Sequence, residues 1–362
     1  MQKIEKKRIR TTGYGLDLLS ALASCSSTIL VREKSIMFTQ SFLTPQPTGK
    51  FTNFARWPGR RIAHCTLVLL STLVLSACSD NDDDLLNSSQ TVSTRASGML
   101  VTTQEANGIT FHTLTAPETQ FANSTHLIET ENSLVVFDTQ FLLPNAQDMR
   151  AYADELGKTI DRVFITHEHP DHFLGSEVFS DRPIYSLQSV SELISANGDA
   201  EVVEKQGDFG AENIASTYVV PQVVSPGTIL IDGITFELEQ VMDAEAAVQL
   251  VVRLPEHGVI ITGDIVYSGV HLILAGQPAS WTTALENLAA SASQYPIVLA
   301  GHGAPADPGV YDVNIAWLTK AAELLATVDN GQDFKQGLVD AFPDLTMTAA
   351  IDFVLPLLFP AN

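Results

Sequence analysis

Residues 166–172 read Thr-His-Glu-His-Pro-Asp-His, which places four possible metal ligands within six residues. His167 and His169 alternate, so an extended backbone presents both on one face, and Asp171 and His172 follow about one turn later. Neutral imidazole and carboxylate suit zinc or a similar divalent cation. Because the string directly follows a β-like run (Ile-Asp-Arg-Val-Phe-Ile), we predict a metal-binding loop after a strand, in preference to a surface cluster of histidines.

The sequence downstream of residue 98 alternates strand-like and helix-like runs. We expect strands over residues 108–114, 124–128, 133–138, 160–165, 228–231, 234–241, 248–253, 259–262 and 296–300. We expect helices over residues 145–156, 280–293, 310–328 and 333–342, and an apolar end at 353–359 that packs onto the core. Strands followed by helices, twice over, predict an α+β domain with two sheets face to face and helices outside.

The segment before this domain reads as an export signal. Residues 60–64 are basic, residues 65–77 are apolar, and residues 75–78 read Leu-Ser-Ala-Cys. This pattern is typical of a signal peptide with a bacterial lipoprotein cleavage site, and the apolar run is shorter than the roughly 20 residues that span a bilayer. Cleavage would leave Cys78 as the lipid-bearing first residue. Serine at position 79, directly after that cysteine, resembles the pattern of Gram-negative lipoproteins that go to the outer membrane and face the periplasm or the cell surface. The alternative is that the apolar segment is an uncleaved anchor helix.

The flanking segments complete the predicted domain organisation. Residues 1–59 are long for a signal n-region and show no periodicity. We therefore interpret this extension as the result of a start codon assigned too far upstream, with Met37 as the true start. Residues 79–97 are rich in Ser, Asn, Asp and Thr and predict a flexible tether. Residues 98–362 are of a length that fits one large domain.

Charge and cysteine content limit the function further. Of the 20 Lys and Arg, 11 lie in residues 1–78, whereas only 3 of the 42 Asp and Glu do, which leaves a net charge near −30 beyond residue 78. Such a field repels polyphosphate, so a small-molecule substrate is favoured over nucleic acid. The three cysteines (Cys25, Cys65 and Cys78) all precede the predicted domain. Any metal there must be held by nitrogen and oxygen alone.

From residue 108 to 305 the chain resembles the metallo-β-lactamase superfamily. The resemblance depends on the 166–172 loop, on Asp138 at the end of an early strand, on Gly263-Asp264, and on Gly301-His302-Gly303. It implies a four-layer αββα sandwich with these motifs at one end. It also implies that His167 and His169 bind a first metal, that Asp171, His172 and His302 bind a second, and that Asp264 bridges the two. Asp138 would orient the loop without binding metal.

One departure from the family pattern concerns the first metal. Most members carry a histidine between the first motif and the Gly-Asp strand, but residues 173–256 contain none. Glu245 is the best replacement ligand and Asp243 the next, an arrangement that resembles the alkylsulfatase branch, although that branch carries additional C-terminal domains. A carboxylate here weakens Lewis acidity and shifts metal preference from zinc toward manganese or iron. The alternative is that Glu245 is a surface acid beside a weak first site.

These inferences predict a hydrolase with two divalent metal ions and a metal-bridging hydroxide that Asp171 or Asp264 orients. An ester, lactone, amide or sulfate ester in the periplasm is the expected substrate class. A metal-binding lipoprotein with lost catalysis is the main alternative, and a redox member with a single iron is disfavoured by the second-site residues. The sequence leaves the oligomeric state open.

Other polar and aromatic residues have less specific interpretations. His271 lines the substrate cleft or belongs to an ordinary loop, and Tyr267 is a candidate hydroxyl donor to an oxyanion. We expect packing or turn roles for the remaining residues of this kind, namely Trp281, His112, His126 and His257.

Overall fold

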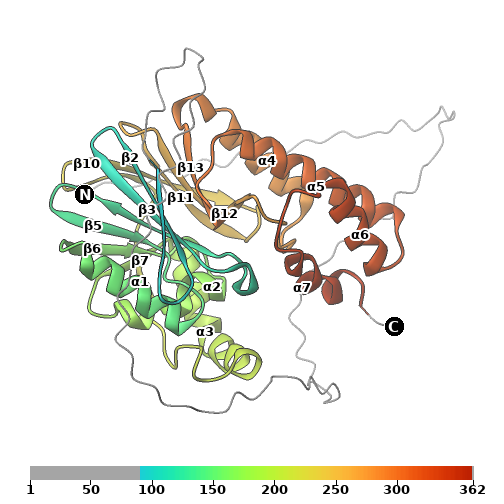
Figure 1. The fold of residues 1–362 in the computed structure, drawn as a ribbon, viewed down its shortest axis with the longest axis horizontal. Helices are drawn as coiled ribbons and strands as arrows, with labels where there is room; N and C mark the ends of the chain where they lie inside the picture. Colours follow the sequence, from blue (N-terminus) through green and yellow to red (C-terminus); the bar gives the residue numbers. More distant parts are fainter. Residues whose placement is uncertain (1–89, 361–362) are drawn as a thin grey trace, which may run out of the picture. The chain divides into compact units, whose positions relative to one another are not determined.

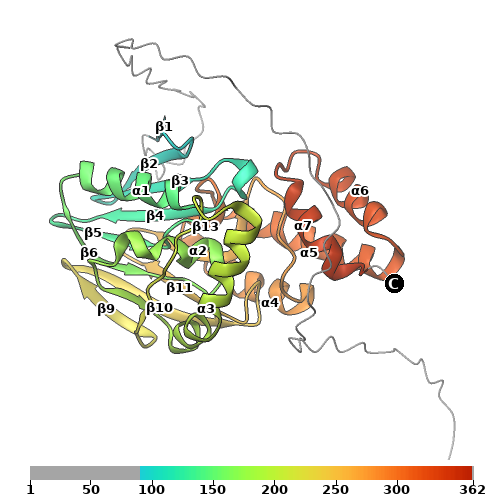
Figure 2. The same cartoon turned by 90° about the horizontal axis from the view of Figure 1, so that it is seen from below.

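The computed structural model describes residues 90–360, whose two β-sheets lie face to face between groups of helices (Figures 1 and 2). One sheet has, in spatial order, β1 (Thr91–Thr94), β2 (Leu100–Ala106), β3 (Ile109–Thr115), β4 (Ser124–Glu129), β5 (Ser133–Phe137), β6 (Thr159–Phe164), β7 (Ile184–Ser186) and β8 (Gln222–Val223). The other has β13 (Ile297–Gly303), β12 (Val259–Ser268), β11 (Val248–Leu254), β10 (Ile234–Met242) and β9 (Gly227–Ile231).

Helices cover the outer faces of both sheets (Figure 1). Those beside the first sheet are α1 (Leu143–Glu155), α2 (Pro170–Phe173) and α3 (Gln188–Phe209). Those beyond the second sheet are α4 (Pro278–Ala289), α5 (Gly309–Thr327), α6 (Gly331–Ala341) and α7 (Ala349–Leu358), of which α4 and α5 contact β12. Short 3₁₀ turns lie at Glu118–Gln120, Leu174–Phe179 and Ala292–Gln294. The predicted α+β sandwich of two sheets with outer helices is therefore confirmed.

The central strands of the second sheet, β11 and β12, are apolar on both faces because they are covered on both. In β11, Leu250 and Val252 belong to the core shared with the first sheet, whereas Val251 packs toward the helices. The neighbouring β12 repeats this alternation with Ile261 and Ile260. A strand buried on both faces reads as a continuous apolar run, which explains why it was visible in the sequence.

Strand direction brings the functional segments to one edge. The β5–β6 pair is parallel, as is the β12–β13 pair, so within each pair the carboxyl ends meet at the same rim. Asp138 and the 166–172 loop follow β5 and β6, while Asp264 and His302 lie in the second halves of β12 and β13.

Several elements differ from the sequence prediction. The strand predicted over 259–262 continues to Ser268, and the 22-residue helix α3 was not expected. Its Asn-Gly-Asp interruption at 197–199 has low helix propensity. Gly198 is nevertheless required there, because a Cβ atom would lie 2.4 Å from the ring of Tyr218.

Of the segments predicted before the domain, only the end of the tether, from residue 90 to 97, lies within the described residues. Strand β1 lies inside the segment predicted as a tether (79–97), and Arg95 pairs with Asp148 of α1. The folded domain therefore begins before residue 98. The interpretation of residues 1–59, the signal peptide over 60–78 and the lipidation of Cys78 lie outside the described residues. Within residues 90–360, no helix combines the length and apolar character needed to cross a bilayer.

Candidate metal centre

Asp138 holds the 166–172 loop in place through contacts with Thr166 and His172. Its Oδ1 accepts a 2.8 Å hydrogen bond from the backbone N–H of Thr166, and its Oδ2 accepts one of 2.8 Å from the Thr166 hydroxyl. The same Oδ2 lies 2.9 Å from Nδ1 of His172. Asp138 adopts φ +62°, a left-handed conformation that Asp tolerates better than most residues. Its carboxylate is thus turned toward the loop, in the orienting position that the resemblance implied.

Helix α2 begins at Pro170, directly after His169. Proline is favoured in the first turn of a helix because a backbone N–H has no intrahelical acceptor there, so its absence costs no hydrogen bond. The turn changes the direction of the chain between His169 and Asp171. As a result, the two halves of the loop face two different sets of partners.

Asp264 and His302 come from the adjacent strands β12 and β13. Nε2 of His302 lies 3.0 Å from Oδ2 of Asp264, and Nδ1 of His302 donates to the Phe121 carbonyl at 2.7 Å. That donation fixes the tautomer and leaves the Nε2 lone pair free toward Asp264. Gly301 makes the approach sterically allowed, because a Cβ atom there would lie 1.9 Å from Oδ1 of Asp264.

The Tyr267 ring stacks on His302 with centroids 4.6 Å apart and planes at 4°. Its hydroxyl donates to Oδ2 of Asp264 at 3.2 Å, and the side chain is buried. Tyr267 therefore positions Asp264 and does not offer its hydroxyl to a substrate oxyanion, which was the role considered from the sequence.

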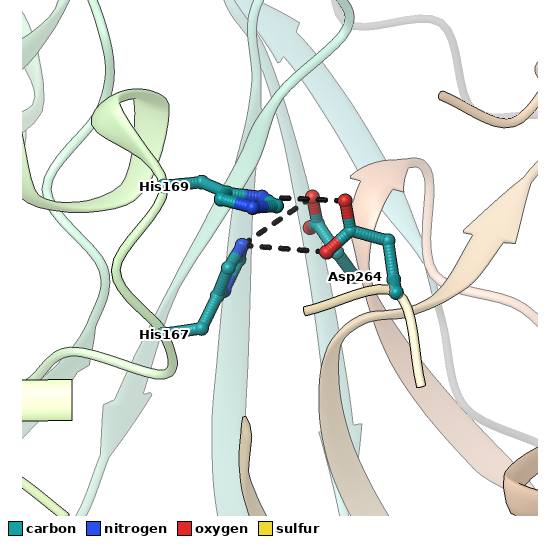
Figure 3. A group of neighbouring side chains, drawn as sticks. His167, His169 and Asp264 are labelled. Atoms are coloured by element: carbon teal, nitrogen blue, oxygen red, sulfur yellow. Dashed lines mark ion pairs between the residues drawn. The ribbon is translucent and has the colours of Figure 1, made fainter. Parts of the chain in front are cut away.

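His167 and His169 both point toward the carboxylates that face the 166–172 loop, one of which is Asp264 (Figure 3). Nε2 of His167 lies 3.6 Å from Oδ2 of Asp264 and 3.8 Å from Oε2 of Glu245. Nδ1 of His169 lies 3.2 Å from Oε1 of Glu245. Imidazole and carboxylate from three separate segments therefore converge on one point.

Glu245 lies in the turn between β10 and β11 and is only 3% exposed. Asp243, the other candidate for the missing ligand, is exposed and does not belong to the cluster. Nε2 of Gln249 donates to Oε2 of Glu245 at 3.1 Å and leaves Oε1 directed at His169. Gln249 is not among the residues predicted from the sequence, although a lone amide in the apolar strand Val-Gln-Leu-Val-Val is a visible signal.

The ligand atoms form two groups, each with its atoms within 4.8 Å of one another. The first group consists of His167, His169, Glu245 and Asp264, and the second of Asp171, His172, Asp264 and His302. Asp264 belongs to both.

The donor atoms of this cluster fit divalent cations. Buried atoms without a hydrogen-bond partner in the described part of the chain include His167 Nε2, His172 Nε2, Glu245 Oε1 and Asp264 Oδ1. Two of them, His172 Nε2 and Asp264 Oδ1, lie 3.1 Å apart, and Glu245 Oε1 lies 3.2 Å from His169 Nδ1, so these atoms converge on a shared space without hydrogen-bond geometry. Nitrogen and carboxylate oxygen at this spacing are the ligands that zinc, manganese or iron accept.

The side chains of the cluster also perturb one another's protonation. Burial would lower the pKa of His172, but Asp264 and Asp171 raise it well above its usual value. Burial raises the pKa of Asp264, yet His172 and His302 together hold it well below its usual range. Burial raises the pKa of Glu245 to about 7, against the attraction of His169. Protons shared among these groups are what a cation must displace.

The remaining candidates take structural positions. His271 is buried, and its Nδ1 accepts a 3.0 Å hydrogen bond from Trp317 Nε1, away from the cluster. His126 lies 3.0 Å from the Ala300 carbonyl, and His112 lies 3.0 Å from Glu129. The substrate-lining role considered for His271 is therefore wrong, while the other two have the packing roles expected.

A cavity of about 450 Å³ opens over the cluster. His169, Asp171, Glu245 and Asp264 form part of its wall. The rest of the wall consists of Phe121, Phe141, Pro170, Glu201, Lys205, Asp208, Phe209, Ile273, Ala275 and Phe353. Its volume lies in the range typical of small-molecule sites.

Comparison with known proteins places this arrangement in a family. A sequence model described as "Metallo-beta-lactamase superfamily" matches residues 119–302. Among solved structures, the DIM-1 metallo-beta-lactamase has 17% identity and a TM-score of 0.48, covering 64% of this chain and 99% of its own. The metallo-beta-lactamase from Pontibacter korlensis has 17% identity and a TM-score of 0.46, with the same two coverages. The Erythrobacter litoralis enzyme has 16% identity and a TM-score of 0.48, covering 63% and 99%. No curated protein matches the chain.

Proposed function

Since the chain belongs to the metallo-beta-lactamase superfamily, a family of metal-dependent hydrolases, we propose that it is a hydrolase with two divalent cations. The observation that carries the proposal is the sharing of Asp264 by two four-residue ligand groups. A carboxylate has two oxygens, so one side chain can serve two cations at once. The placement of its two oxygens supports this role, since Oδ2 lies 3.6 Å from Nε2 of His167 in the first group and Oδ1 lies 3.1 Å from Nε2 of His172 in the second.

The chain's own residues position the attacking water. Bound divalent cations supply Lewis acidity and lower the pKa of a coordinated water. Asp171 lines the cavity with its side chain 17% exposed, and its Oδ2 lies 3.3 Å from His172 Nε2 and 3.4 Å from His302 Nε2. Asp171 or Asp264 orients the attacking water. Hydrolysis adds the hydroxyl to the carbonyl or sulfuryl centre and returns the proton to the leaving oxygen or nitrogen.

Glu245 in place of an imidazole would change the Lewis acidity and the metal preference of the first site. A carboxylate adds negative charge to the ligand set, which reduces Lewis acidity and favours a harder cation. Its burial and the Gln249 hydrogen bond support a ligand role over that of a surface acid. We propose zinc as the resident metal, with manganese or iron as the alternatives that this ligand change favours.

Metal analysis tests the assignment directly. The purified wild type should hold about two equivalents of divalent metal, Glu245→Ala about one, and Glu245→His about two again. Glu286→Ala is the matched control, because Glu286 is an exposed acid on α4. One equivalent in the wild type would overturn the dinuclear site. Equal occupancy in all variants would reject Glu245 as a ligand.

Turnover separates the hydrolase from its main alternative. A panel of esters, lactones, amides and sulfate esters should include a substrate whose hydrolysis is lost in Asp264→Asn. Two bound equivalents without turnover on any compound would favour a metal-binding protein with lost catalysis.

A further inference from the structure

The outer wall of the cavity is aromatic. Phe121, Phe141, Phe209 and Phe353 lie on different segments, yet their rings pack edge to face. The shortest centroid distance is 4.9 Å, between Phe141 and Phe209, with planes at 84°. Phe353 of α7 is 51% exposed and Phe209 of α3 is 36% exposed. Exposed large apolar side chains gathered at the mouth of one cavity are typical of a ligand-binding surface.

Helix α3 presents one face to this cavity. Glu201, Lys205, Asp208 and Phe209 all line it, and their spacing of four, three and one residues places them on one side of a helix. Lys205 already forms ion pairs, because its Nζ lies 2.6 Å from a carboxylate oxygen of Glu204 and 3.8 Å from one of Glu201. Apart from His169, it is the only cationic side chain among the described residues of the wall. An anionic group of a substrate would therefore find no free basic partner beyond the metal cluster.

Charge alone does not define the occupant, because the wall carries the acidic Glu201 and Asp208 as well as the basic Lys205. The four phenylalanine rings are the apolar part of the wall, so an apolar group is the best occupant of that part of the cavity.

We infer that this cavity selects substrates in which an apolar acyl or aryl group lies against Phe121, Phe141, Phe209 and Phe353, next to the bond cleaved at the metal cluster. The inference rests on the proposed hydrolase function. It narrows the open substrate list to compounds that carry such an apolar group beside the cleaved bond.

Chain-length dependence tests the inference. For p-nitrophenyl acetate, butyrate and octanoate, kcat/KM of the metal-loaded protein should rise by about two- to fourfold per methylene that the wall buries. The double variant Phe209→Ala/Phe353→Ala should flatten this rise. The matched control is Val203→Ala/Leu357→Ala, which removes exposed side chains from α3 and α7 that do not line the cavity. A kcat/KM that stays flat or falls from acetate to octanoate in the wild type would overturn the inference.

Direct binding separates this inference from the hydrolase proposal. Nile red, an uncharged apolar dye, should bind to the wild type and to Asp264→Asn, with about tenfold weaker affinity in the double phenylalanine variant. Dye binding that depends on the phenylalanines without ester turnover would uphold the apolar cavity and overturn the hydrolase. Turnover that is flat with chain length, with dye binding unchanged by the phenylalanine substitutions, would overturn the cavity inference alone.

Discussion

Gln249 and Glu245 form a buried pair in which Nε2 of Gln249 donates a 3.1 Å hydrogen bond to Oε2 of Glu245. The pair links a strand of the second sheet to the turn that carries the one unusual member of the ligand cluster. Since Oε2 is occupied by the amide, Oε1 is the oxygen left facing His169. Gln249 thus sets the direction of a candidate metal ligand without belonging to the cluster itself.

Replacing Gln249 with leucine should weaken metal binding. The substitution keeps the approximate volume but removes the donor that orients Glu245, and loss of such an outer partner typically costs about 10- to 100-fold in metal affinity. Competition with a chromophoric chelator measures the affinity of each site. Gln240→Leu, at an exposed position of β10, is the control and should bind as the wild type does. Unchanged affinity in Gln249→Leu would show that Glu245 is held by other contacts.

Asp138 should matter for both stability and metal binding. Asp138→Ala removes the acceptor for two Thr166 donors and the partner of His172, and leaves buried polar groups unpaired. We expect a loss of at least about 2 kcal/mol in the free energy of unfolding, or about 4–8 °C in Tm. Asp138→Asn tolerates the same positive φ and keeps one acceptor, so it should lose less. Thermal unfolding with excess chelator separates this effect from metal loss, and equal Tm values for alanine and wild type would contradict the orienting role.

The loop and its distant partners were predictable because their chemistry is encoded in residue identity. The 166–172 string, Asp264 and His302 each follow or close an apolar run, so both the ligand types and their position at strand ends were readable. Glu245 was predictable in a different way, from a histidine that the family pattern required and the chain lacked. The structure brings these side chains together at one rim.

The aromatic wall was not predictable, for a physical reason. Phe209 and Phe353 lie on helices with no local motif, and each resembles an ordinary core residue until the chain is folded. Helix α3 was missed because its Asn-Gly-Asp break weakens local propensity, while tertiary contact with Tyr218 compensates. His271 is the opposite case, a residue considered for the cavity that does not line it, because proximity to Asp264 in the sequence is not proximity in the fold. Backbone direction after β12 carries it to Trp317 instead.

The sequence of residues 60–78 predicts a lipid-modified Cys78, and this prediction can be tested in a Gram-negative host. Full-length protein should fractionate with the outer membrane and incorporate labelled palmitate. Cys78→Ser should abolish both lipid incorporation and cleavage by the lipoprotein signal peptidase. Cys65→Ser, within the same apolar run, is the matched control and should leave both intact. Labelling of Cys78→Ser would exclude this site of modification.

His126 should make the domain acid-sensitive independently of metal. Its ring is buried between the sheets, with Nε2 3.0 Å from the Ala300 carbonyl and Nδ1 2.9 Å from the Thr113 hydroxyl. Burial lowers its pKa to about 4 from an ordinary value of 6.5. The unfolded chain therefore binds a proton at a higher pH than the folded chain, so the His126 contribution is fully present above pH 6.5. It is lost as the pH falls toward 4.

The corresponding loss in the free energy of unfolding is about 1–3 kcal/mol over that interval, at about 1.4 kcal/mol per pKa unit. Urea unfolding at pH 7.5 and pH 4.5, with chelator present throughout, measures it. His126→Gln keeps an amide donor for the Ala300 carbonyl but does not titrate, so its stability should fall less between the two pH values. His257→Gln, in the β11–β12 turn, should behave as the wild type does. Parallel pH profiles for His126→Gln and the wild type would assign the acid sensitivity to other groups.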